Sequence, residues 1–63
     1  MLYDFLFELT EYSDNEGEQI LVECNTLDRA WEILRHNGFH DDEVMFLDRM
    51  SVEEGEMLGY DTY

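Results

Sequence analysis

The sequence contains no lysine and only three arginines, against seventeen aspartates and glutamates, so the formal net charge is −14 over 63 residues. Neutralising phosphates requires lysine and arginine, and this composition therefore argues against direct binding of nucleic acid or of an anionic membrane. Proline is also absent, and no repeat, low-complexity run or linker divides the chain. We expect a single domain, residues 1–63.

Cysteine is nearly absent as well, since Cys24 is alone and no disulfide framework can form. A lone cysteine fits a reducing, cytoplasmic setting. The N-terminus lacks the basic segment of a secretory signal peptide and reaches Asp4 at once. No apolar run approaches the ~20 residues of a membrane-spanning helix, so we expect neither secretion nor a membrane anchor.

Hydrophobic residues make up 44% of the chain and aromatics 14%, which favours folding over disorder. Residues 2–12 (LYDFLFELTEY) alternate as a β-strand does. One face carries Tyr3, Phe5, Phe7 and Leu9, and the other carries Asp4, Glu8 and Thr10 with Leu2 and Leu6 among them. Because this second face is partly apolar, we expect the strand to be central in its sheet.

A polar turn, SDNEG at 13–17, precedes a second predicted strand at 18–24, and the two strands are expected to form an antiparallel hairpin. Alternation places Ile20, Val22 and Cys24 inward and Gln19, Leu21 and Glu23 outward.

A helix is predicted next, capped by Asn25 or Thr26 and ended near Gly38, with Phe39 folding back on its last turn. Its apolar stripe consists of Leu27, Ala30, Trp31 and Leu34, widened by Ile33. Glu32 has the right spacing to pair with either Arg29 or Arg35.

Residues 43–50 (EVMFLDRM) predict a third strand, and the apolar run 44–47 suggests burial on both faces. Ser51 and Glu54 form a capping box that opens a short helix, which Gly55 weakens and Gly59 ends. Residues 60–63 form a tail. The expected fold is α+β, a small ββαβα sandwich: a three-stranded, mostly antiparallel sheet with one main helix packed on it and a short C-terminal helix.

The topology gathers acidic residues at two ends of this fold. The main helix carries the chain back across the sheet, so the third strand is expected to start beside the hairpin tip. We call the carboxylates expected there, without any basic residue, the tip cluster: Glu11, Asp14, Glu16, Glu18, Asp41, Asp42 and Glu43. The C-terminal cluster is Glu53, Glu54 and Glu56. At ~3.4 Å per residue, the third strand separates the two clusters by ~25 Å.

Metal and enzyme chemistry find little support. His36 and His40 have the spacing of helical zinc ligands, but Gly38 is expected to end the helix between them. An EF-hand aligned on Gly17 places Tyr12 where the first ligand is needed. Cys24 points inward with no base to activate it. We therefore expect no enzyme activity, no catalytic residue, no cofactor and no dedicated metal site.

The size, the acidity and the stretches EYSDNEGE, HDDE and VEEGE resemble the small acidic DNA-mimic proteins that phages and mobile elements encode, of the anti-CRISPR and anti-restriction type. The resemblance implies a non-enzymatic inhibitor that blocks the nucleic-acid-binding surface of a host defence complex, with a CRISPR effector favoured. Both clusters would contact a basic partner, and the chain would be a monomer or a weak dimer. Tyr12, Tyr60 and Tyr63 are possible interface anchors.

Two other functions stay open at this stage. One is a protein-interaction or regulatory module of a mobile element that uses an exposed sheet edge and apolar residues such as Leu6 or Leu21. The other is a salt-adapted protein of unrelated function, because an acidic, lysine-free surface also suits a high-salt cytoplasm.

Overall fold

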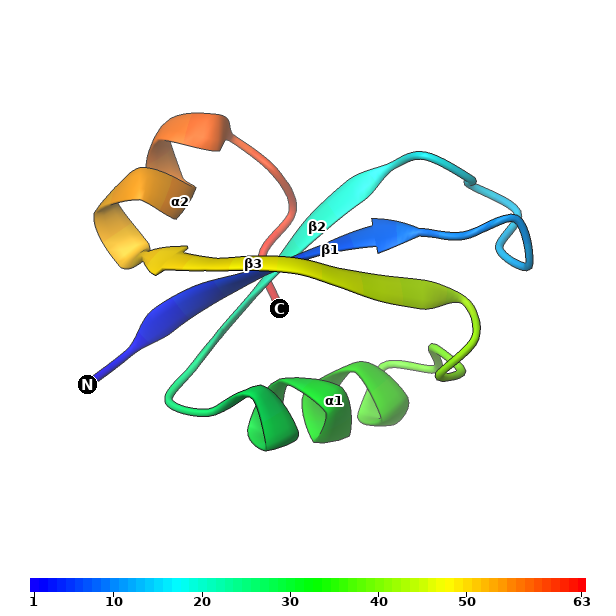
Figure 1. The fold of residues 1–63 in the computed structure, drawn as a ribbon, viewed down its shortest axis with the longest axis horizontal. Helices are drawn as coiled ribbons and strands as arrows, with labels where there is room; N and C mark the ends of the chain where they lie inside the picture. The colour runs from blue at the N-terminus through cyan, green and yellow to red at the C-terminus, as the bar shows by residue number, and fades with distance from the viewer.

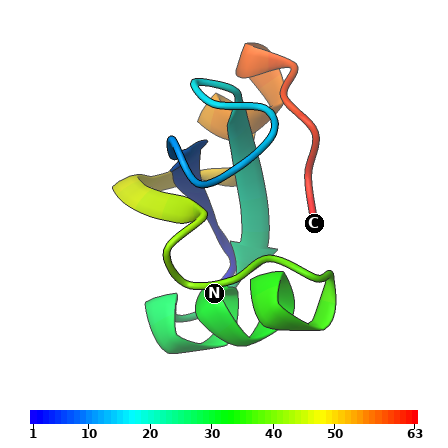
Figure 2. The ribbon, with the colours of Figure 1, turned by 90° about the vertical axis from the view of Figure 1, so that its right-hand side faces the viewer.

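A computed structural model describes all residues, 1–63, and confirms the α+β class. Its elements in chain order are β1 (Tyr3–Leu9), β2 (Gln19–Cys24), α1 (Leu27–His36), β3 (Val44–Ser51) and α2 (Val52–Leu58). The strand order is β2-β1-β3, and β1 is antiparallel to both neighbours, as expected of a central first strand. Helix α1 covers one face of the sheet and α2 lies on the other (Figures 1 and 2). Neither helix is both long and apolar enough to cross a membrane.

The core lies between the sheet and α1. The predicted inward faces of β1 and β2 supply most of it, and Ala30, Leu34 and Val44 complete it. Trp31 packs edge-on against Phe7, with ring centroids 5.0 Å apart. The alternation of β1 and the 3.6-residue stripe of α1 therefore meet as the sequence predicts.

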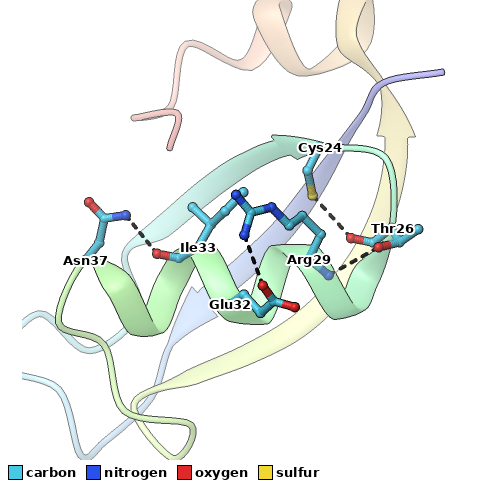
Figure 3. Close-up of polar contacts among 6 residues, drawn as sticks. All are labelled: Cys24, Thr26, Arg29, Glu32, Ile33 and Asn37. Carbon is cyan, nitrogen blue, oxygen red and sulfur yellow. Dashed lines mark hydrogen bonds and ion pairs between the residues drawn. The ribbon is translucent and has the colours of Figure 1, made fainter.

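Both ends of α1 are capped by local hydrogen bonds, and Figure 3 shows the Thr26 cap and the Asn37 side-chain amide that donates to the Ile33 carbonyl at 2.8 Å. The hydroxyl of Thr26, and not Asn25, is the N-cap and accepts the Arg29 N–H at 3.2 Å. At the other end the Phe39 N–H donates to the Leu34 carbonyl at 3.0 Å, across Gly38 at φ +90°. This arrangement is a Schellman motif, so the predicted glycine cap is confirmed.

The prediction that β3 is buried on both faces is wrong. Only Val44 is buried in this strand, whereas Met45 and Leu47 are 47% and 40% exposed. β3 is an edge strand, and the short α2 covers the second face only near the end of β3. Leu47 is also displaced by a β-bulge, because the register steps from Leu6–Asp48 to Phe7–Phe46.

The second face of the sheet is more enclosed than alternation suggests. Leu21, predicted to point outward, is fully buried. The tail runs alongside it as a short parallel segment, and the Leu21 N–H donates to the Asp61 carbonyl at 2.9 Å while the Tyr63 N–H donates to the Leu21 carbonyl at 2.8 Å. The residues after α2 thus extend the sheet beyond β2.

Candidate partner-binding surface

The tip of the β1–β2 hairpin and the loop before β3 lie at the same end of the molecule, as the topology predicts. Leu9 pairs with Val44, and the Thr10 N–H donates to the Glu43 carbonyl at 2.9 Å. The Thr10 hydroxyl donates a second bond to the Asp42 carbonyl. The hairpin tip and this loop are at the right of Figure 1, and α2 is at the left. The molecule is 30 Å long, so the tip and C-terminal clusters occupy opposite ends.

The expectation that no basic residue reaches the tip cluster is wrong. Arg35, in the last turn of α1, donates from Nε and Nη2 to the two carboxylate oxygens of Asp41 at 2.9 and 3.1 Å. This hydrogen bonding by Arg35 lowers the pKa of Asp41 below its ordinary value. Asp41 is therefore a compensated charge that fastens the loop to the helix.

Glu43 also has a structural role. Its side chain is three-quarters buried and accepts the His40 backbone N–H at 2.9 Å, with the His40 ring 3.9 Å away. The tip-cluster members without an ion pair that remain exposed are Glu11, Asp14, Glu16, Glu18 and Asp42, and we call these five the open tip.

An open groove of about 410 Å³ runs between the hairpin tip and the loop. Carboxylates of the open tip, Glu11, Glu16 and Asp42, line it together with Tyr12 and Met45. Tyr12 is 67% exposed, so an aromatic ring stands beside the acidic wall. Tyr63, another predicted anchor, instead packs edge-on against Phe39 with ring centroids 5.5 Å apart, while Tyr60 is exposed in the tail.

The C-terminal cluster lies on α2 and is exposed throughout. Ser51 caps this helix by accepting the Glu54 N–H at 3.2 Å and donates its hydroxyl to the Glu54 carboxylate at 3.3 Å. Glu53 and Glu54 lie in the first turn, where the helix dipole favours negative charge. No arginine pairs with this cluster.

The remaining surface is far less acidic on the α1 side. Within α1 the formal charges of Asp28 and Glu32 sum to zero with those of Arg29 and Arg35, although the ion pair of Arg35 is with Asp41 outside the helix. Arg29 pairs with Glu32 at 3.0 Å (Figure 3). Arg49, the third arginine, lies 4.4 Å over the Tyr3 ring. The net −14 of the chain is therefore carried entirely outside α1.

The side chains considered for metal or nucleophile chemistry are dispersed. No group of three or more histidine, cysteine, aspartate or glutamate side chains is arranged to hold a metal ion. His36 ends α1 and His40 follows the Gly38 cap. The Cys24 thiol is buried and donates to the Thr26 carbonyl at 3.2 Å, and burial raises the pKa of this thiol.

Both edges of the sheet are occupied or irregular. The tail pairs with β2, so Leu21, named above as a possible apolar contact, is not available at the surface; Leu6 stays half-buried. On β3 the bulge at Leu47 interrupts the ladder, and the Asp48 carboxylate accepts the Arg49 N–H at 2.8 Å. Bulges and edge charges discourage pairing with another strand, and no observation favours binding through a sheet edge.

Comparison with known proteins gives no further guidance: no protein-family model, no curated protein and no solved structure matches this chain.

Proposed function

We propose that this protein is a non-enzymatic inhibitor that mimics the charge of DNA and occupies the nucleic-acid-binding surface of a host defence complex. The source would be a phage or another mobile element, and a CRISPR effector is the favoured target. The observation that carries the proposal is the distribution of charge: open carboxylates at both ends of a 30 Å molecule and a formally neutral helix α1.

The charge density is comparable with that of DNA. A duplex as long as this molecule, 30 Å, carries about 18 phosphates at one per ~1.7 Å. The protein has a formal net charge of −14, and helix α1 contributes none of it. A partner that binds DNA would therefore meet a similar total charge over a similar length when the face away from α1 is turned toward it.

The proposed contacts are ion pairs between carboxylates and the lysine and arginine side chains that normally hold phosphates. Such pairs form charge-assisted hydrogen bonds and steer association over long range. Within the open tip, the groove beside Tyr12 and Met45 offers a cationic side chain both charge and an apolar wall for its methylene stem. Binding should weaken steeply as salt is added.

The test is competition with DNA on a panel of purified, guide-RNA-loaded CRISPR effectors. One variant neutralises three open-tip residues, Asp14→Asn, Glu16→Gln and Asp42→Asn, and leaves Asp41 in place because it holds Arg35. The matched control, Asp28→Asn, Glu23→Gln and Asp61→Asn, makes the same chemical changes at exposed sites elsewhere that form no ion pair. Both variants shift the net charge equally, from −14 to −11.

The native protein should displace DNA from at least one effector and lose affinity between 50 and 200 mM salt. At about 0.5–1 kcal/mol for each of the three lost pairs, the open-tip variant should bind roughly 10- to 150-fold more weakly, and the control should bind nearly as well as the native protein. Equal weakening in both variants would mean that only net charge matters. Failure to displace DNA from any effector would contradict the proposed target class.

A further inference from the structure

Asp4 is the only charged residue buried in this protein, and it lies under α2. Its side chain is 2% exposed, although it belongs to the face of β1 that points away from the core. Gly55 of α2 comes so close that a methyl group added there would lie 1.8 Å from Asp4 Oδ2. Asp4 Oδ1 has no hydrogen-bond partner. The helix therefore closes directly over a carboxyl group and leaves one of its oxygens unsatisfied.

Two neighbouring carboxylates oppose a negative charge on Asp4, and no neighbouring cation favours it. On β2 the cross-strand neighbour is Glu23, and on α2 the nearby charge is Glu56. On β3 the neighbour is Met50, which carries no charge. Arg49 faces away, because it lies over Tyr3 on the opposite side of the sheet. Burial, reinforced by the Glu23 and Glu56 carboxylates, raises the pKa of Asp4.

The helix above Asp4 is lightly attached. Gly55 is its only buried residue, and Met57 and Leu58 are 88% and 43% exposed. Gly59 ends the helix at φ +73° before the tail rejoins β2. An element with so few buried apolar contacts opens at a lower free energy than the core does, while its two ends stay tethered to the sheet.

We propose that Asp4 and α2 form a proton-controlled latch: α2 docks on the sheet over the neutral Asp4 carboxyl group and is released when that group ionises. Opening admits water to Asp4 Oδ1, which in the docked state is buried and has no hydrogen-bond partner. The C-terminal cluster moves with α2, so protonation of Asp4 holds the carboxylates of this cluster at their docked positions on the sheet. The latch depends on contacts within the chain and is independent of the proposed partner.

The direction of the pH effect follows from the raised pKa. Docking is fully favoured below the ordinary value of 3.8, where Asp4 is protonated in both states. As pH rises from there to the pKa of docked Asp4, the ratio of open to docked molecules increases tenfold per pH unit. Above that pKa the ratio no longer changes with pH. The total loss of docking, in powers of ten, must therefore equal the docked pKa minus the pKa in the open state.

This equality can be tested by two independent NMR measurements on the same protein. The carboxyl carbon of Asp4 gives its pKa directly, and hydrogen-exchange protection factors of the Gly55, Glu56 and Met57 amides give the opening of α2 at each pH. Asp4→Asn keeps the shape and removes the titration, whereas Asp14→Asn makes the same change of net charge at the exposed hairpin tip.

In the native protein and in Asp14→Asn, the protection of α2 should fall across the titration of Asp4 by the number of decades that the pKa shift dictates. In Asp4→Asn it should stay flat. Glu56→Gln, an exposed change on α2, should lower the Asp4 pKa and reduce the loss of α2 protection by the same number of decades. This variant provides the test if Asp4→Asn folds poorly. The latch is refuted if the protection of the α2 amides does not change across the Asp4 titration. It is also refuted if core amides such as that of Val22 lose protection together with the α2 amides.

Discussion

Replacing Gly55 by alanine tests the close contact between α2 and Asp4, because local and tertiary effects have opposite signs. In an exposed helix, alanine is more favourable than glycine by about 1 kcal/mol. Here the new methyl carbon would lie 1.8 Å from Asp4 Oδ2 and 2.6 Å from its Cγ, far inside the ~3.5–4.0 Å of a carbon contact. Inserting a methyl group into a well-packed site costs about 1–3 kcal/mol, and an approach as short as this one belongs in the upper part of that range, about 2–3 kcal/mol. We expect Gly55→Ala to destabilise the protein by about 1–2 kcal/mol.

For a domain of this size, a change of 1 kcal/mol shifts the melting temperature by about 4–8 °C. Thermal unfolding followed by circular dichroism at a pH below the ordinary Asp4 pKa of 3.8, where α2 is docked over the neutral carboxyl group, should therefore show a clear decrease in melting temperature. The same substitution in an Asp4→Ala background is the control, since the Oδ2 and Cγ contacts are gone and only the Asp4 Cβ, 2.8 Å away, remains. There Gly55→Ala should be neutral or stabilising, which gives a coupling free energy of about 2 kcal/mol. A higher melting temperature in the native background would show that α2 does not rest on Asp4.

Two further predictions concern residues that the tertiary structure covers. Deleting Tyr60–Tyr63 removes three backbone hydrogen bonds to β2, which should lower the free energy of unfolding by about 2–4 kcal/mol and promote self-association through the uncovered edge. Urea unfolding and sedimentation measure these two effects, and Tyr63→Ala is the control that keeps the backbone. A truncated chain that stays monomeric and equally stable would contradict this role of the tail. Cys24, 5% exposed and hydrogen-bonded to Thr26, should react with a thiol reagent about a thousandfold more slowly in the native protein than in denaturant, and labelling at comparable rates would show that the thiol is accessible.

The fold could be predicted from the sequence because its signals are local. Alternation in β1 and β2, the apolar stripe of α1 and the glycine cap at Gly38 each depend on residues within one element or one turn. The central place of β1 followed from its partly apolar second face. The start of β3 beside the hairpin tip followed from one further step, since the main helix must carry the chain back across the sheet. The meeting of the tip with the 41–43 loop came from the same argument.

The features that were missed depend on contacts between distant elements. The pairing of Arg35 with Asp41 is set by the direction in which the last turn of α1 faces the loop, which the spacing of six residues does not reveal. The burial of Leu21 requires the tail to return along β2. The burial of Asp4 requires α2 to fold back over β1, and the signal available was Gly55, a glycine in the middle of a helix otherwise well supplied with caps.

The structure also changes how the excess of negative charge bears on stability. The two clusters stand at opposite ends of a 30 Å molecule, several times the ~8 Å screening length at physiological salt, so they barely repel one another. In the open tip and in the C-terminal cluster the carboxylates are exposed to water, where a pair of like charges a few ångströms apart costs only about 1 kcal/mol or less. Asp4 is different, because desolvation and two neighbouring carboxylates act on a single buried group. The domain can therefore carry its dense outer charge at little cost, and its electrostatic weak point is the one carboxyl group that it keeps from water.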